Sequence, residues 1–171
     1  FHAVYIEPDP FRGLQDGLRA VAVLQSNGDR NGVSLALFCV GMNYAALGAF
    51  EASEAALREA RTLSIATQST FYATVIHLHL AFVLADQPLT VKQAEARSIG
   101  ELYAQAQFGP AVLGAANRIM AQVRLATGEL ESVEAPIQIA LDASAWMLMR
   151  YLYVAPLHIE FLLRTGDSSG A

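Results

Sequence analysis

Turns that end helices recur along this chain at a nearly constant interval. Gly48, Asp86, Gly128 and Gly166 are 38, 42 and 38 residues apart, with helix-forming sequence between them. A period near 40 residues with two helices per unit is typical of a solenoid, in which neighbouring units stack because no unit can bury its apolar face alone. The sequence therefore predicts an all-α, right-handed superhelical solenoid of antiparallel helix pairs, with about eight helices.

Helix signals dominate between these turns. Ala and Leu are abundant, apolar residues recur near the 3.6-residue period, and no useful period-2 alternation is present. Pro156 predicts a kink or a break in the last helix. The chain is interpreted as one domain over 1–171, with repeat units at about 8–28 (partial), 31–64, 69–106, 111–143 and 145–171 (partial). The predicted helices cover 10–25, 31–47, 50–64, 69–85, 90–106, 111–127, 130–143 and 145–164.

The segment 40–60, VGMNYAALGAFEASEAALREA, has large, small and aromatic residues at the offsets of a known repeat pattern. Leu37 stands where that pattern usually has Trp, and the segment 124–141, RLATGELESVEAPIQIAL, repeats the second half of the pattern. These segments resemble the tetratricopeptide-repeat family. The long period resembles the degenerate arrays of large bacterial signalling proteins. The middle unit departs from the pattern at Asp86-Gln87-Pro88, where Gly is expected, and the phase of its second helix stays open.

The resemblance implies a binding surface on the concave face, lined by the first helix of each pair. Arg118 is the best candidate for a polar contact, because a guanidinium suits a partner's carboxylate. For Ile76 and Leu80, whose assignment depends on the phase of the middle unit, packing against neighbouring helices is an equal alternative. The residues assigned to this face by their offset from the turn are Phe38, Met42, Ile76, Leu80, Arg118 and Gln122.

Composition excludes some partners. The net charge is −5, and the 11 Lys and Arg residues form no basic stripe, which argues against nucleic acid. The segments 31–50 and 62–85 contain no charged residue, yet their many polar residues favour buried helices over membrane spans. With 54% apolar and 16% charged residues, the chain has more apolar surface than an isolated domain needs. Part of that surface is expected to meet a neighbour.

The single cysteine, Cys39, allows no internal disulfide and indicates a reducing, cytoplasmic environment. Packed on a helix, it is interpreted as a small apolar filler and not as a nucleophile. The chain begins with Phe1 and shows no signal-peptide pattern, so we expect it to belong to a longer protein.

Metal and catalytic motifs are weak. His77 and His79 are two residues apart on a predicted helix, so their side chains point in nearly opposite directions, and His158 with Glu160 has the same spacing. The glycines are isolated and follow helices, which does not match a phosphate-binding loop. The sequence predicts no cofactor, no metal and no enzymatic activity.

The sequence predicts recognition of a protein or peptide by the concave face. Two alternatives stay open. One is sensing of an apolar small molecule, which a closed pocket would favour. The other is a structural spacer or a dimerisation surface, which would give a solution mass near twice that of the chain.

Overall fold

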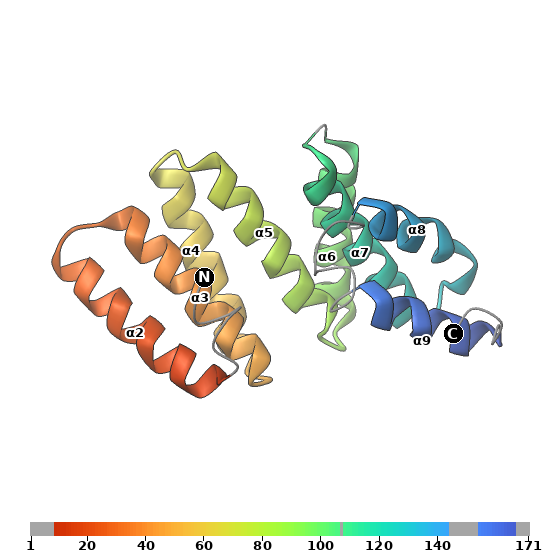
Figure 1. Cartoon of the computed structure of the whole chain (residues 1–171), viewed down its shortest axis with the longest axis horizontal. Coiled ribbons are helices and arrows are strands. Elements are labelled where there is room, and N and C mark those ends of the chain that lie inside the picture. Colours follow the sequence, from red (N-terminus) through yellow and green to blue (C-terminus); the bar gives the residue numbers. More distant parts are fainter. Residues whose placement is uncertain (1–8, 107, 144–153, 167–171) are drawn as a thin grey trace. The chain divides into compact units, whose positions relative to one another are not determined.

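The computed structural model describes residues 9–106, 108–143 and 154–166, and within these ranges every regular element is a helix. The predicted all-α fold, with consecutive helices packed on one another, is confirmed (Figure 1). The elements are α2 (Pro10–Ser26), α3 (Arg30–Ala46), α4 (Phe50–Ala66), α5 (Thr70–Ala85), α6 (Thr90–Gln105), α7 (Pro110–Thr127), the 3-10 turn η1 (Leu130–Ser132), α8 (Glu134–Ala143) and α9 (Ala155–Thr165).

The helices begin at a regular interval. The helices α2 to α7 start at residues 10, 30, 50, 70, 90 and 110, so one helix with its turn takes 20 residues and a pair takes 40. This spacing settles the phase of the second helix in the middle pair, α6, which the sequence left open. Residues 40 apart therefore occupy equivalent positions and are called equivalent below.

Four turns share one hydrogen-bond pattern that closes a helix. At Gly48, the N–H donates to the Ala45 carbonyl at 2.9 Å, and the Ala49 N–H donates to the Tyr44 carbonyl at 2.9 Å. This pair of bonds needs a left-handed residue, which is why Gly is favoured there. The residues in this position are Gly28, Gly48, Gln68 and Gly128, with φ of 71°, 74°, 57° and 79°.

The chain divides into two compact units, Phe1–Val83 and Leu84–Ala171. In the first unit α3 packs against both α2 and α4. A Cβ placed on Gly41 of α3 would lie 2.7 Å from the Leu57 Cγ on α4, so only Gly permits this approach. The Ser53 hydroxyl donates to the Gly41 carbonyl at 2.7 Å and ties the two helices together.

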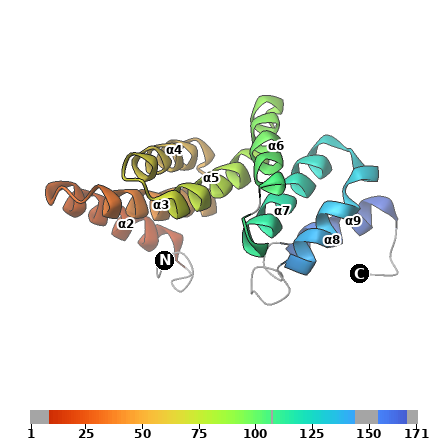
Figure 2. The ribbon, with the colours of Figure 1, turned by 90° about the horizontal axis from the view of Figure 1, so that it is seen from above.

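The second unit is arranged in the same way around α7, which packs against both α6 and α8 and lies between them (Figure 2). A Cβ on Gly100 of α6 would lie 3.0 Å from the Met120 sulfur on α7. The core beyond α7 is formed by Val133, Ile137 and Ala140, and the Arg164 guanidinium of α9 donates to the Leu125 carbonyl at 2.7 Å.

Proline residues lie near the start of two helices, α8 and α9. The prediction of one helix over 130–143 is wrong for its first residues, because the turn η1 precedes α8. Pro136 lacks an N–H, so the bond that would extend the α-helix back to Ser132 cannot form. Pro156, near which a kink or a break was predicted, lies in the first turn of α9, a position that tolerates Pro. Residues 144–153 of the predicted last helix lie outside the described residues.

Candidate functional site

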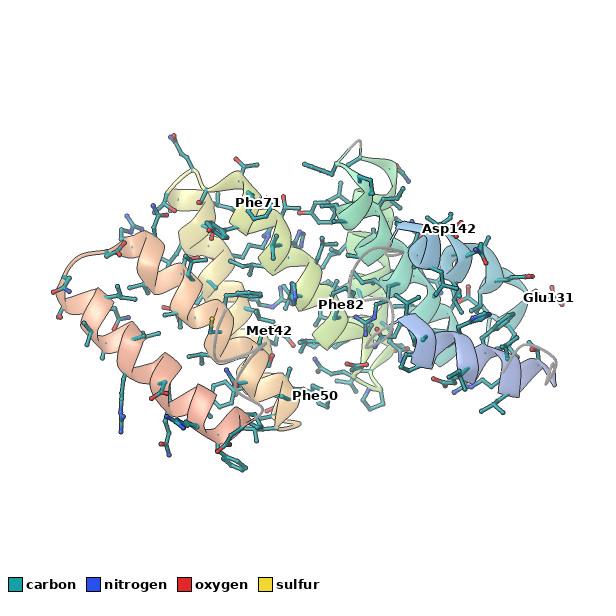
Figure 3. All side chains as sticks on the ribbon, viewed as in Figure 1. Met42, Phe50, Phe71, Phe82, Glu131 and Asp142 are labelled. Carbon is teal, nitrogen blue, oxygen red and sulfur yellow. The ribbon has the colours of Figure 1, made fainter. Side chains whose placement is uncertain are left out.

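The three apolar residues predicted to bind a partner in the first unit are buried. Phe38 on α3 and Ile76 and Leu80 on α5 are at most 3% exposed. Phe38 contacts the edge of the His79 ring, with the ring centres 4.9 Å apart. Burial favours the packing interpretation of these residues, since a partner could reach them only after a rearrangement. Met42, also on α3, stays partly exposed (Figure 3).

In the second unit, the structure brings together Arg118 and Gln122, the other two predicted residues. They lie one turn apart on α7 and therefore share one face of that helix. The Gln122 side-chain amide donates to Oδ1 of Asp86, and the Arg118 guanidinium attracts the same carboxylate. Asp86 lies between α5 and α6 and belongs to the same unit. Asp86, Arg118 and Gln122 are called the carboxylate cluster below.

Burial within the cluster disfavours the charged form of Asp86. Desolvation raises the pKa of this carboxyl above its ordinary value of 3.8, and the positive charge of Arg118 and the hydrogen bond from Gln122 only partly reverse that shift. Asp86 nevertheless keeps an exposed side, so its desolvation is partial. A carboxylate with a raised pKa beside a guanidinium is a common feature of functional sites.

One atom of the cluster has no partner. Gln122 is 7% exposed, and its Oε1 is buried without a hydrogen bond, a property shared among the described side chains only with the Nε atoms of Arg61 and Arg124. A buried acceptor left in this state costs about 1–3 kcal/mol. The opposite orientation of the amide would place its oxygen against the Asp86 carboxylate, so it offers no relief. The cluster can therefore accept one more N–H or O–H donor.

A second group of polar residues lines a groove of about 310 Å³ along α6. Its guanidinium, on Arg97, is paired with Glu129, which also accepts a 2.7 Å hydrogen bond from Thr127. The hydrogen bond from Arg97 lowers the pKa of Glu129, and the bond from Thr127 adds to this effect. The charges of Arg97 and Glu129 thus neutralise each other, so this groove is a weaker candidate for a binding site than the carboxylate cluster.

The third candidate is an apolar groove of about 690 Å³ beside the α6–α7 connection and the end of α8. Phe108, Leu113 and Ile139 contribute exposed apolar side chains, and Asp142 lies at its edge (Figure 3). The Asp142 carboxylate accepts a hydrogen bond from Gln138 at 2.9 Å.

The described residues contain no group of three or more His, Cys, Asp or Glu side chains placed to hold a metal ion. The ring Nδ1 of His79 lies 2.8 Å from the Val75 carbonyl, as expected for a histidine bonded within its own helix. Cys39 is half-buried on α3. Among the helices of the described part of the chain, none combines the length and apolar character needed to cross a membrane.

Comparisons of the chain with protein-family models, with curated proteins and with solved structures found no match. The carboxylate cluster is thus known from geometry alone. Sequence reasoning found Arg118 and Gln122 by their offset from a turn, but it interpreted Asp86 only as a turn residue. The signal available in the sequence was that this turn has an acidic residue, Asp86, whereas the corresponding turns of the other pairs have Gly48 and Gly128.

Proposed function

We propose that this chain is a binding module of the tetratricopeptide kind that recognises a partner protein or peptide and performs no chemical reaction. The partner is bound through an acidic side chain at Arg118 and Gln122. One observation carries the proposal: the Gln122 amide donates a hydrogen bond to the Asp86 carboxylate, and the Arg118 guanidinium, on the same face of α7, attracts that carboxylate electrostatically. An arrangement that holds one carboxylate has the donors needed to hold another.

The orphan oxygen of Gln122 supports the same proposal. Oε1 is buried and has no partner in the chain itself, so a peptide that offers a carboxylate to Arg118 can also offer it a main-chain N–H once the side chains that cover this atom move. Satisfying that acceptor removes a cost already present in the unbound protein. Binding would therefore gain from a group that the folded chain leaves unused.

The test is fluorescence anisotropy with labelled peptides that differ only in Glu against Gln at one position. Arg118→Gln should weaken binding of the Glu peptides by about tenfold or more, since a hydrogen bond to a charged group is lost. Arg19→Gln is the matched control, because Arg19 is an exposed guanidinium on α2 in the other unit. Equal binding by Arg118→Gln and the control, or no preference for Glu over Gln, would contradict the proposal.

A second candidate function is self-association through α2. Phe11 is 67% exposed and Leu18, two turns later on the same helix, is 46% exposed. Light scattering tests this candidate directly: a mass twice that of the chain, reduced to a single chain mass by Phe11→Ser with Leu18→Ser, would support it. A single chain mass for the unaltered protein at high concentration would exclude it.

A further inference from the structure

The donors of Arg118 and Gln122 already have an occupant in the unbound chain. The Asp86 carboxylate accepts the hydrogen bond of the Gln122 amide and lies in the field of the Arg118 guanidinium. A partner's carboxylate therefore competes with this side chain for the same donors. We propose that Asp86 is an internal ligand of the Arg118–Gln122 site and that a partner's acidic side chain must displace it. This inference rests on the proposed function and adds its regulation.

The position of Asp86 allows it to leave. It follows directly after α5, in a turn that lacks the left-handed residue and paired bonds found at Gly48 and its counterparts. Its side chain is partly exposed, so rotation about the side-chain bonds can move the carboxylate into water without moving a helix. Gln87, the next residue, is buried and its carbonyl accepts a 3.3 Å bond from Gln93, which holds the backbone in place. The side chain can thus exchange while the turn stays fixed.

The internal ligand fits the site incompletely. Its carboxylate engages the Gln122 amide nitrogen, but it has no donor for the buried Oε1 of the same side chain. Desolvation raises the pKa of Asp86 and would act on a partner's carboxylate in the same way, so the advantage of a partner comes from a donor for Oε1. An acidic residue in an extended peptide supplies both a carboxylate and a neighbouring N–H. Such a ligand can compete successfully even though Asp86 is tethered beside the site.

The test uses acetate, the simplest carboxylate, on the full chain labelled with ¹⁵N. Sodium acetate is titrated against sodium chloride at constant ionic strength, and the side-chain N–H resonances of Arg118 and Gln122 are followed. In Asp86→Ala the half-saturating acetate concentration should be about tenfold lower than in the unaltered chain, with Asp86→Asn between them. Asp142→Asn, which removes an exposed carboxylate from α8, should behave as the unaltered chain.

Each outcome decides something. Equal half-saturating concentrations in all four proteins would overturn the internal-ligand proposal and leave the proposed binding site standing. A failure of Arg118 and Gln122 to respond to acetate in any variant would overturn both. If acetate gives no response, a pH titration shows whether Asp86 contacts Gln122 at all. Gln122 resonances that follow ionisation in the unaltered chain and not in Asp86→Asn would mean that Asp86 contacts Gln122 but that the site does not bind an external carboxylate. Circular dichroism checks that the variants are equally helical.

Discussion

The helices α4 and α6 occupy equivalent places in successive pairs, yet they carry different residues at the positions that pack a pair together. On α4, Ser53 and Leu57 are fully buried against α3. The equivalent residues of α6 are Gln93 and Arg97, and the Arg97 side chain is 31% exposed. On α8 the equivalent residue of Leu57 is Ile137, which is 2% exposed. The middle pair therefore has an amide and a guanidinium where the other two have core residues.

This difference teaches where the repeat is interrupted. The boundary between the two compact units, after Val83, falls within the middle pair. Both groups of charged residues, the Arg97 groove and the carboxylate cluster around Asp86, involve residues of this pair. The pairs α3–α4 and α7–α8 thus keep core residues at these positions. The middle pair has polar residues there, next to the candidate binding site.

The largest expected difference is between Leu57→Ala and Arg97→Ala. Leu57 is fully buried, so its truncation should lower the free energy of unfolding by about 2–5 kcal/mol through lost burial and a cavity. Arg97 contributes a partly exposed ion pair with Glu129, and its loss should cost about 0–1 kcal/mol. Urea denaturation followed by circular dichroism measures both values. Ile137→Ala should behave like Leu57→Ala, and comparable losses for Leu57→Ala and Arg97→Ala would remove the distinction drawn between α4 and α6.

Two helical glycines allow a sharper comparison. A Cβ on Gly41 would meet the branched Leu57 side chain at 2.7 Å and the Ser53 carbonyl at 3.3 Å, so Gly41→Ala should cost about 1–3 kcal/mol. A Cβ on Gly100 would meet a backbone carbonyl at the same 3.3 Å, that of Ala116, but its nearest neighbour would be the flexible Met120 thioether at 3.0 Å, which can move aside. The helix propensity of Ala, worth about 1 kcal/mol over Gly, should then make Gly100→Ala nearly neutral. Thermal unfolding of both variants checks the order, which would be wrong if Gly100→Ala proved the more destabilising.

The sequence predicted the helices well for a physical reason. Gly28, Gly48 and Gly128 mark turns whose geometry needs a left-handed residue, so these glycines indicate in the sequence where a helix ends. Gly41 and Ser53 are two of the small residues in the repeat pattern of segment 40–60, and the structure places both where α3 and α4 approach each other closely. Gln68 lies in the connection between the predicted helices 50–64 and 69–85, but its positive φ was not predicted, since nothing in its side chain signals one.

The candidate site was less predictable. Arg118 and Gln122 could be selected by their spacing along one helix, but their meeting with Asp86 joins residues more than 30 apart in sequence and depends on packing. Burial of Ile76 and Leu80 likewise depends on neighbours that periodicity does not identify. An apolar helical position fits a binding groove and a core equally well. Only the three-dimensional arrangement distinguishes the two.

A smaller effect should distinguish two turns that share one hydrogen-bond pattern, by backbone conformation alone. Gln68 has φ of 57°, a conformation that costs a residue with a Cβ about 1–2 kcal/mol, so Gln68→Gly should stabilise the chain by about 0.5–1 kcal/mol. The reverse change, Gly48→Gln, should destabilise it by about 1 kcal/mol, because no atom lies within 4 Å of an added Cβ and only the φ of 74° opposes it. Paired urea titrations measure both changes. A loss of stability in Gln68→Gly would mean that the Gln68 side chain contributes more than its backbone costs.

The smallest effect concerns the pH dependence of stability at Asp86. Burial, only partly offset by Arg118 and Gln122, raises the pKa of this carboxyl in the folded chain above its ordinary value of 3.8. The folded state therefore holds the proton more tightly than the unfolded state, and stability falls as pH rises through the interval between the two pKa values. Asp86→Asn removes this ionisation, so the variant should gain stability relative to the unaltered chain at neutral pH. The gain should shrink as the pH falls through the interval between the two pKa values and should be absent below pH 3.8. Urea denaturation at a series of pH values measures it, with Asp142→Asn as the control for the loss of one exposed negative charge. A gain that is the same at every pH would show that the carboxylate cluster stabilises neither protonation state of Asp86 over the other. Burial would then impose no free-energy cost on the ionised carboxylate of Asp86.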